Sequence, residues 1–407
     1  MQSRIAFGST ICYTRLHMVR REFWIDRVQS AWKHRSVVWL SGVRRVGKTC
    51  LCQSLAGEPD TSPLEYFDCD LPRARRQMQD PEGFLEGLRD RRVVLDEIHR
   101  LPNPTELLKV AADHFPEIRV IATGSSTLQA SAKFRDGLTG RKTEVWLTPM
   151  IDADHEAFGG ADLGQRLLLG GLPPYFLQGA PRGADFQEWL ESYWARDVQE
   201  LFRVERRGSF LRFVELLLAN SGSMFEATKY ASHCEVSRPT ITNYLGLAEA
   251  THVARVVRPY STRLAAEIVS APKVYGFDTG FVCHVRGWLA LRPEDLGRLW
   301  EEYVLNELHA LLPKRAIHYW RDKHGHEVDF VLLRKGKPPL ALECKWSVAA
   351  VDLRNLRSFR SRHPQGENWI VAHDMGRAFT RTDDDLRVTF LGLPALAERL
   401  GGNGDDA

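Results

Sequence analysis

The sequence predicts an α/β protein with a parallel sheet in its first part and smaller mixed units after it. Residues 34–147 alternate helical stretches with five short β-type runs, SVVWL, PLEYFD, RRVVLDE, RVIATGSS and TEVWLTP. Short apolar strands separated by helices are typical of a parallel sheet that is covered on both faces. Residues 150–200 have a helical pattern. The next stretch, to about Asp278, has helices followed by short strands, and the rest has a helix, a set of strands and another helix.

Composition narrows the class of protein. The chain has 407 residues, of which 43% are hydrophobic and 26% are charged, so we expect about two to four domains of a globular protein. No apolar run is long enough to cross a bilayer, and the N-terminus lacks the apolar core of a secretory signal. We therefore expect a cytoplasmic protein without a membrane partner. The net charge of +3 neither requires nor excludes nucleic acid.

The seven cysteines are scattered and include no CxxC pair, so the sequence supports neither a disulfide framework nor a zinc site. Glycine and proline near Gly287, Pro293 and Gly297 indicate a domain boundary. The predicted organisation is a leader (1–18), a P-loop domain (19–150), a helical linker or lid (151–201), a winged helix-turn-helix domain (202–288), a C-terminal α/β domain (295–400) and a tail (401–407).

The assignment of a P-loop rests on SVVWLSGVRRVGKTCLCQSLA, which reads as a β-type run, a loop and a helix. The loop has the full GxxxxGK[ST] spacing from Gly42 to Thr49, in the required strand-to-helix context. Glycines let backbone N–H groups surround a phosphate, Lys48 adds positive charge for the β- and γ-phosphates, and the Thr49 hydroxyl is a ligand for Mg²⁺. We therefore expect ATP and Mg²⁺ to bind here. The predicted nucleotide contacts are Gly42, Val43, Arg44, Arg45, Val46, Gly47, Lys48, Thr49 and Cys50.

Two carboxylates end the third β-type run, RRVVLDEIHRLPN. Ligands of open parallel sheets bind at the carboxyl ends of the strands, where Asp96 and Glu97 are expected to lie. Asp96 would hold Mg²⁺ through water, and Glu97 would orient or deprotonate the attacking water. The alternative is a strand followed by a solvated acidic turn.

Two further positions are candidates for phosphate contact. Ser125 or Ser126, after the run IRVIAT, could reach the γ-phosphate, although a turn that caps the next helix fits the same residues. Arg141, in GLTGRKTEV, could reach a phosphate within the chain or across a subunit contact, and a solvated arginine fits the same pattern.

The middle of the chain has a helix-turn-helix pattern. A short helix precedes a polar turn at residues 235–237, and a second helix then starts with Pro239 in its first turn and Ser237 as its cap. The run HVARVVRPY would form the wing. The predicted DNA contacts are Arg238, Thr240, Thr242 and Asn243. The same fold could instead serve only for packing or assembly.

The C-terminal segment YWRDKHGHEVDFVLLRKGKPPLALECKWS reads as two strands joined by the turn RKGKPP. If Leu333 pairs with Leu340, Asp329 lies opposite Cys344. Residues two apart in a strand share a face, so Glu343 and Lys345 point together, and a register shift of one residue brings Asp329 to the same face.

This trio is suited to metal-dependent cleavage of a phosphodiester. Asp329 and Glu343 would hold Mg²⁺, and Lys345 would position or deprotonate the attacking water. Glu301 or Glu302, on the helix LWEEYVLNELHAL, could add a ligand, and Glu302 is the one predicted. The alternative is an exposed hairpin whose charges keep its edge soluble. Against it, Glu343 and Lys345 interrupt the apolar run LALECKW, where an unpaired charge is costly.

With these motifs together, the sequence resembles a family of prokaryotic AAA-type P-loop ATPases that carry a winged helix and a C-terminal restriction-endonuclease-like domain. The resemblance covers nearly the whole chain after Met18. It rests on GVRRVGKT, VVLDEIHRLPN, ATGSS, GLTGR, the segment through KVYGFDTG, LWEEYVLNEL, HEVDFVL and LECKWS. The segment ARDVQEL, around Arg196, also resembles the family, but the resemblance gives it no role.

The resemblance implies Walker roles for Lys48, Thr49, Asp96 and Glu97. It implies a PD-(D/E)xK site for Asp329, Glu343 and Lys345, with Val328 in place of the leading proline. The leading hypothesis is an ATPase coupled to DNA binding and to a metal-dependent nuclease-like domain, with self-association into a homo-oligomer as one means of coupling. The alternatives are an ATP-driven DNA-binding switch with an inactive C-terminal fold, and an ATPase that docks proteins.

Overall fold

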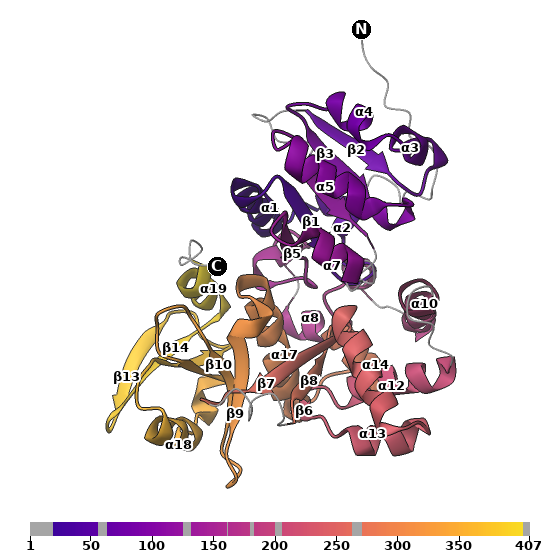
Figure 1. Ribbon diagram of the computed structural model, residues 1–407. Coiled ribbons are helices and arrows are strands. Elements are labelled where there is room, and N and C mark those ends of the chain that lie inside the picture. Colours follow the sequence, from indigo (N-terminus) through magenta and orange to yellow (C-terminus); the bar gives the residue numbers. More distant parts are fainter. Residues whose placement is uncertain are drawn as a thin grey trace.

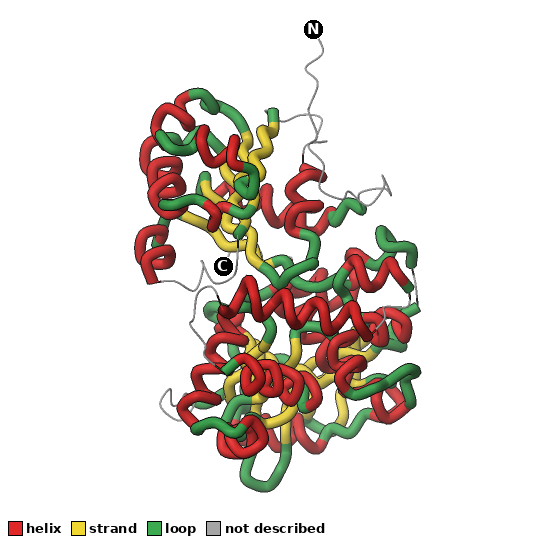
Figure 2. Tube along the Cα trace, turned by 90° about the vertical axis from the view of Figure 1, so that its right-hand side faces the viewer, coloured by secondary structure: helices red, strands yellow, loops and turns green. Residues whose placement is uncertain are grey.

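The computed structural model describes residues 19–55, 63–124, 132–160, 162–179, 183–199, 206–262 and 271–401. Figure 1 shows the N-terminal sheet with its helices above, and the middle and C-terminal parts beside each other below. The long helix α17 (Pro293–Leu311) runs between these two lower parts. Figure 2 shows most strands in the interior of the molecule, with helices around them.

The first sheet has five parallel strands in the order β2-β3-β4-β1-β5. Its strands are β1 (Val37–Ser41), β2 (Leu64–Asp68), β3 (Arg92–Asp96), β4 (Arg119–Thr123) and β5 (Lys142–Trp146). All five predicted runs are therefore strands, and the α/β prediction for this part is confirmed. Because the strands are parallel, the ends of β1, β3 and β4 lie at one edge, with β4 between the other two.

Helices cover both faces of this sheet. Along β1, Val38 and Leu40 belong to one buried cluster, whereas Val37 and Trp39 belong to another, as the alternation of a strand requires. α1 packs into the first cluster, and α5 and α7 pack into the second. The helices of this part are α1 (Glu22–His34), α2 (Lys48–Ser54), α3 (Pro72–Gln77), α4 (Pro81–Glu86), α5 (Pro104–His114) and α7 (Ala132–Leu138), with the 3-10 turn η2 (Ile98–Arg100).

Short helices connect the sheet to the middle part. They are η3 (Asp152–Asp154), α8 (Leu163–Leu169), α9 (Pro173–Gln178) and α10 (Gly183–Tyr193), followed by the π-helical turn η4 (Trp194–Val198). The π-helical turn overlaps the first four residues of the ARDVQEL segment. Such turns are rare and are frequently found at functional sites.

In the middle part, helices are followed by the strands β7 and β8, as predicted, but a short strand also lies between the first two helices and a helix follows the strands. Its elements are α12 (Arg207–Ala219), β6 (Ser223–Met224), α13 (Ala227–Cys234), α14 (Arg238–Ala250), β7 (Ala254–Pro259), β8 (Lys273–Gly276) and α16 (Thr279–Val285). The side chain of Ser237 caps α14 by accepting a hydrogen bond from the backbone N–H of Thr240, as predicted. The assignment of this part as a winged helix stays a prediction.

The C-terminal strands continue the middle sheet. They are β9 (Ile317–Arg321), β10 (Glu327–Leu332), β11 (Leu340–Lys345), β12 (Asn368–Ala372), β13 (Phe379–Asp383) and β14 (Leu386–Leu391), with α18 (Arg354–Arg362), α19 (Leu393–Gly401) and the turns η5 (Lys314–Ala316) and η6 (Val348–Ala350). The strand order is β13-β14-β12-β11-β10-β9-β7-β8-β6, because β7 pairs with β9. The predicted boundary between residues 288 and 295 therefore does not separate two sheets.

The hairpin of β10 and β11 corrects the predicted register. Leu340 pairs with Leu332, not with Leu333. Continuing this antiparallel register past the Phe330–Leu342 pair places Asp329 opposite Glu343. This is the one-residue shift that brings the two carboxylates to the same face.

Among the helices that the structure describes, none combines the length and the apolar composition that a bilayer crossing requires. None of the six cysteines within the described ranges forms a disulfide, and Cys12 lies outside those ranges.

Candidate nucleotide-binding site

The loop between β1 and α2 has a backbone that its glycines make possible. Gly42 has φ of 144° and Gly47 has φ of 102°, conformations that L side chains rarely adopt. A Cβ atom at Gly42 would also lie 2.4 Å from the carbonyl oxygen of Leu147. Both glycines of the motif are therefore required by the fold of the loop itself.

Lys48 is folded back onto this loop. Its Nζ donates hydrogen bonds to the carbonyl oxygens of Gly42 at 2.8 Å and Val43 at 3.1 Å. Burial lowers the pKa of Lys48, and this effect outweighs the opposing influence of Glu97, Asp197 and Asp96. The lysine is held where the loop curls, and a phosphate there would give it a stronger acceptor.

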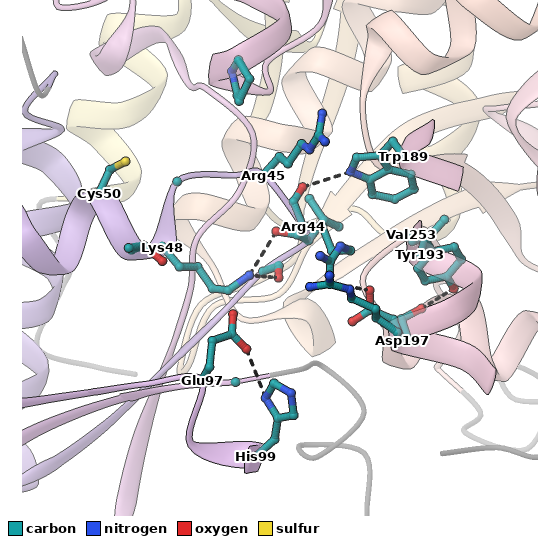
Figure 3. Close-up of a pocket in the computed structure, with 18 of the residues that line it drawn as sticks. Arg44, Arg45, Lys48, Cys50, Glu97, His99, Trp189, Tyr193, Asp197 and Val253 are labelled. Atoms are coloured by element: carbon teal, nitrogen blue, oxygen red, sulfur yellow. Dashed lines mark hydrogen bonds and ion pairs between the residues drawn. The ribbon is translucent and has the colours of Figure 1, made fainter. Parts of the chain in front are cut away.

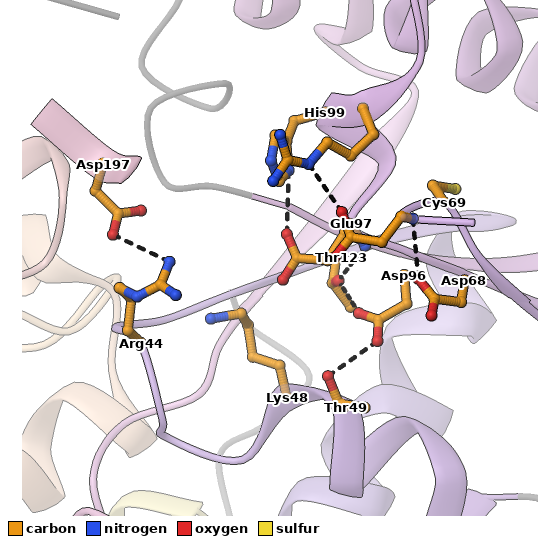
Figure 4. A network of polar contacts seen from close by, with 12 residues as sticks. Arg44, Lys48, Thr49, Asp68, Cys69, Asp96, Glu97, His99, Thr123 and Asp197 are labelled. Carbon is orange, nitrogen blue, oxygen red and sulfur yellow. Dashed lines mark hydrogen bonds and ion pairs between the residues drawn. The ribbon is translucent and has the colours of Figure 1, made fainter. Parts of the chain in front are cut away.

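Asp96, at the end of β3, is the centre of a polar network (Figure 4). Its Oδ2 accepts hydrogen bonds from the Thr49 hydroxyl at 2.9 Å and from the Tyr66 hydroxyl at 2.5 Å. Its Oδ1 accepts a hydrogen bond from the Thr123 hydroxyl, which in turn accepts one from the backbone N–H of Glu97 at 3.1 Å. The ends of β3 and β4 and the start of α2 thus meet at one point.

This pair of groups fits Mg²⁺ in its chemistry. A hydroxyl and a carboxylate are hard oxygen ligands, and Thr49 and Asp96 already lie within hydrogen-bond distance of each other. They are the residues that would hold the ion, which would neutralise phosphate charge there. Among the described residues, no group of three or more His, Cys, Asp or Glu side chains is arranged to hold a metal ion, so substrate phosphates and water would supply the remaining ligands.

Glu97 has a backbone conformation that is uncommon for its residue type. Its φ of 54° and ψ of 42° are left-handed, which turns the chain sharply after β3. Its Oε2 lies 3.1 Å from Nδ1 of His99. Burial raises the pKa of Glu97, but His99, Lys48 and Arg44 together outweigh burial, so the net pKa is lowered. Glu97 is therefore ionised at neutral pH.

The connecting helices hold the phosphate-binding loop from the other side (Figure 3). The indole Nε1 of Trp189 donates to the carbonyl oxygen of Arg44 at 3.1 Å. Arg44 lies 3.5 Å from the buried carboxylate of Asp197, in the π-helical turn, and Arg45 forms an exposed ion pair with Glu188 at 2.7 Å. Both arginines of the loop therefore contact the helical connector.

These elements enclose a cavity of about 300 Å³, at the lower end of the usual range for ligand sites. The loop residues, Glu97 and His99 form one side of it. The other side comes from the connector and the middle part, with Trp189, Tyr193, Arg196, Asp197, Thr251 and Val253. A ligand in this cavity would therefore touch the first part of the chain, the helical connector and the middle part.

The structure brings most predicted nucleotide contacts together but not all. Ser125 lies outside the described residues. Arg141 does not reach this cavity within its own chain, which corrects that prediction. It precedes β5 at the amino edge of the sheet, opposite the loop, and pairs with Asp113 at 2.7 Å. A contact with a phosphate of a neighbouring subunit stays a prediction.

The C-terminal trio is a cluster. Nζ of Lys345 lies 2.6 Å from Oε2 of Glu343, and Oδ2 of Asp329 accepts a hydrogen bond from the backbone N–H of Cys344 at 2.7 Å. Burial raises the pKa of Asp329 well above its usual value, and Glu301 and Glu343 raise it further. Several carboxyl groups therefore lie near one another here, and their repulsion opposes the ionisation of Asp329.

Glu302 is not part of this cluster, and its prediction as a ligand is wrong. It is buried on the other side of α17 and is bonded to the Ser221 hydroxyl at 2.5 Å. Adjacent helical residues differ in direction by about 100°. Its neighbour Glu301 therefore points in another direction, where it pairs with Lys273 at 2.7 Å and raises the pKa of Asp329.

The predicted DNA contacts lie on α14. Arg238, Thr242 and Asn243 are exposed, whereas Thr240 is half-buried and its hydroxyl lies 2.8 Å from that of Ser237. Thr240 therefore contributes to the cap of α14, and the other three residues are accessible.

The sequence interpretation missed several residues of the nucleotide site, among them Tyr66, Thr123, Trp189 and Asp197. Thr123 could have been found, because it ends a β-type run one position before the glycine of ATGSS. Trp189 and Asp197 reach the loop only through the tertiary fold, and no local pattern marks them.

Comparison with known families agrees with this geometry. Residues 34–152 match the AAA domain family. Residues 160–292 match a domain of unknown function (DUF8612), and residues 296–396 match another domain of unknown function (DUF4143). The first part of the chain is thus an AAA-type ATPase-like domain.

Two proteins described as uncharacterised match most of the chain. A protein of Mycobacterium tuberculosis (strain H37Rv) is 29% identical over 351 residues, which cover 84% of this chain and 77% of that protein. A protein of Mycobacterium bovis gives the same values.

Solved structures are more distant. The Walker-type ATPase of Pyrococcus abyssi has a TM-score of 0.41 at 16% identity and covers 66% of this chain and 96% of its own. The replication initiator DnaA, bound to AMPPCP and single-stranded DNA, has a TM-score of 0.27 at 13% identity, with 56% and 86% covered.

Proposed function

We propose that this chain is a Mg²⁺-dependent ATPase that couples nucleotide binding to DNA binding and to a nuclease-like cluster in its C-terminal part. The observation that carries the ATPase proposal is the network of Thr49, Asp96 and Thr123 beside the loop lysine. Two oxygen groups suited to Mg²⁺ and a positive charge thus lie at one sheet edge, with the ionised Glu97 at the same cavity, which supports this proposal.

The proposed roles follow from this geometry. On nucleotide binding, Lys48 exchanges its bonds with the loop carbonyls for phosphate oxygens. Thr49 and Asp96 hold Mg²⁺, which neutralises the charge of the phosphates. Glu97 accepts the proton of the attacking water or orients that water. The Thr123 hydroxyl holds Glu97 in place by accepting a hydrogen bond from its backbone N–H.

Glu97→Gln tests this assignment. The amide keeps the size of the side chain but accepts no proton, so ATP should bind as in the parent while hydrolysis falls by about 100-fold. Phosphate release and binding of a fluorescent ATP analogue measure the two effects. Glu117→Gln is the control, because Glu117 pairs with Arg89 away from the cavity and should leave both unchanged. Hydrolysis at the parent rate in Glu97→Gln would show that Glu97 is not the base.

Contacts between the loop and the rest of the chain support the proposed coupling. Trp189, which binds the carbonyl of Arg44, also stacks on Phe277 with ring centroids 4.8 Å apart. Phe277 follows β8 directly. Tyr193 lies 2.7 Å from the Thr251 hydroxyl, at the end of α14. A change in the loop can therefore reach the middle part through packed side chains.

The proposed DNA surface is the exposed face of α14. Arg238 would contact phosphate, and Thr242 and Asn243 lie beside it on accessible positions. The side chain of Ser237 caps this helix, so the start of the helix and the residues of its first two turns have a fixed position.

Arg238→Ala combined with Asn243→Ala should weaken DNA binding by about 10-fold, the effect expected from losing two contacts of ordinary strength. It should also reduce the dependence of affinity on salt, because fewer counterions are released. Titration of labelled duplex DNA at several salt concentrations measures both. The control is Arg73→Ala, an exposed arginine on α3. Unchanged affinity in the double variant would move the DNA surface elsewhere, most directly to the C-terminal part.

The nuclease-like assignment rests on the cluster of Asp329, Glu343 and Lys345. Mg²⁺ is commonly held by one or two carboxylates together with phosphates, so Asp329 and Glu343 are sufficient in number. Oε1 of Glu343 is buried and has no hydrogen-bond partner among the described residues, so it could bind a cation. The alternative is a fold that binds DNA without cutting it.

A further inference from the structure

A buried carboxylate of the helical connector lies in the wall of the nucleotide cavity. Asp197, in the π-helical turn η4, is only 4% exposed, and both Asp197 and Arg44 of the loop line the cavity. Nη1 of Arg44 lies 3.5 Å from Oδ2 of Asp197 (Figures 3 and 4). Lys48, beside which the phosphates would lie, lines the same cavity. A negative group of the chain therefore shares the cavity with the place proposed for a negative ligand.

The contact between Arg44 and Asp197 is weaker than these two groups could make. A hydrogen bond from a guanidinium to a carboxylate usually measures about 2.7–2.9 Å. Here the distance is 3.5 Å, and Oδ2 of Asp197 has no hydrogen-bond partner among the described residues. The side chain of Arg44 is 30% exposed, so another anion in the cavity could reach it. The two side chains thus attract each other by charge, without a well-formed hydrogen bond.

A phosphate would be a better partner for Arg44 than Asp197 is. The phosphates of ATP carry several negative charges, and a guanidinium can donate two parallel hydrogen bonds to one phosphate group. Burial raises the pKa of Asp197, and Arg44 and Lys48 oppose this rise. Asp197 is therefore stabilised in its charged form by the same two cations that the phosphates would attract.

We propose that Asp197 holds Arg44 in the nucleotide-free chain and competes with the phosphates of ATP for it. The inference rests on the ATP site proposed above. When ATP binds, the guanidinium of Arg44 turns from Asp197 to the phosphates, so Asp197 loses its partner and lowers the affinity for ATP. Because Asp197 belongs to the connector, this exchange makes the affinity for ATP depend on the position of the connector.

Asp197→Asn tests the competition, because the amide keeps the size of the side chain and removes its charge. Titration of the full chain with a fluorescent ATP analogue and Mg²⁺ should show an affinity about 10-fold higher than that of the parent, as expected for loss of a neighbouring unit charge. Glu188→Gln is the matched control, because Glu188 also lies on the connector but pairs with Arg45, at an exposed position. This control should bind the analogue as the parent does.

A double-mutant cycle separates competition for Arg44 from simple repulsion between Asp197 and the phosphates. Arg44→Gln should bind the analogue more weakly than the parent, and Asp197→Asn should give little or no gain when it is added to Arg44→Gln. An equal gain in both backgrounds would mean that Asp197 acts on the phosphates without Arg44, and would overturn the inference.

The outcomes also separate this inference from the proposed function. A parent chain that binds the analogue, together with an Asp197→Asn variant of equal affinity, would reject the competition and leave the ATP site in place. A parent chain that does not bind the analogue would reject both. Thermal unfolding reports whether each variant is folded, and Asp197→Ser replaces Asp197→Asn if the latter is not, with the same expected rise.

Discussion

Lys48→Ala is expected to lower ATP hydrolysis by about 1,000-fold, the upper end of what removal of one preorganised charge costs at such a site. Lys48 donates hydrogen bonds to the carbonyl oxygens of Gly42 and Val43, in the cavity where the phosphates would lie. Without the positive charge of Lys48, the negative charge of the phosphates is less well neutralised, both when ATP binds and when further charge develops during hydrolysis. We therefore expect ATP binding to weaken as well.

Phosphate release at saturating Mg²⁺-ATP and direct titration of a nucleotide analogue measure these two effects. Lys109→Ala is the control, because Lys109 is an exposed lysine on α5, away from the cavity. ATP binding and hydrolysis at parent levels in Lys48→Ala would mean that the phosphates do not lie on this loop.

Asp329→Ala and Lys345→Ala are each expected to remove metal-dependent DNA cleavage and to leave ATP hydrolysis unchanged. Asp329→Ala would remove a metal ligand, and Lys345→Ala would remove the charge that positions water next to Glu343. The two sites share no residue, so a selective effect is expected.

The measurement is incubation of linear and circular DNA with each protein, with and without ATP, in Mg²⁺ and in Mn²⁺. Cleavage that persists in both variants would place the activity outside this cluster. A parent protein that binds DNA but cuts none of these substrates would identify the C-terminal part as a binding module.

Much of the first domain could be predicted, because its signals are local. Each strand is a short apolar run, and the glycines of the loop are fixed by backbone conformation that few other residues adopt. Asp96 follows its strand directly, so its place at the carboxyl edge was predictable. Arg141 was misplaced although a signal existed, since a residue that precedes a parallel strand lies at the opposite edge.

The two wrong predictions in the C-terminal part each concern a choice between adjacent residues, one in a strand register and one on a helix. Leu332 and Leu333 are both apolar residues before a turn, and the sequence does not decide which one pairs with Leu340. Glu301 and Glu302 are adjacent identical residues, and only the packing of α17 decides which one faces the sheet.

Contacts between distant segments could not be predicted at all. The pairing of β7 with β9, which merges two expected units into one sheet, joins Arg258 to His318 across a long stretch of chain. Lys273 likewise reaches Glu301 and Glu327 only because the sheet is continuous. Such contacts depend on tertiary packing and leave no periodic pattern in the sequence.

The most direct test of the ATPase account is nucleotide binding and turnover by the unaltered chain, with Mg²⁺ present and absent. We expect one molecule of ATP to bind per chain, more tightly with Mg²⁺, and phosphate release to depend on Mg²⁺ because Thr49 and Asp96 hold the ion. Failure to bind ATP under either condition would show that this chain is not an ATPase of the proposed kind.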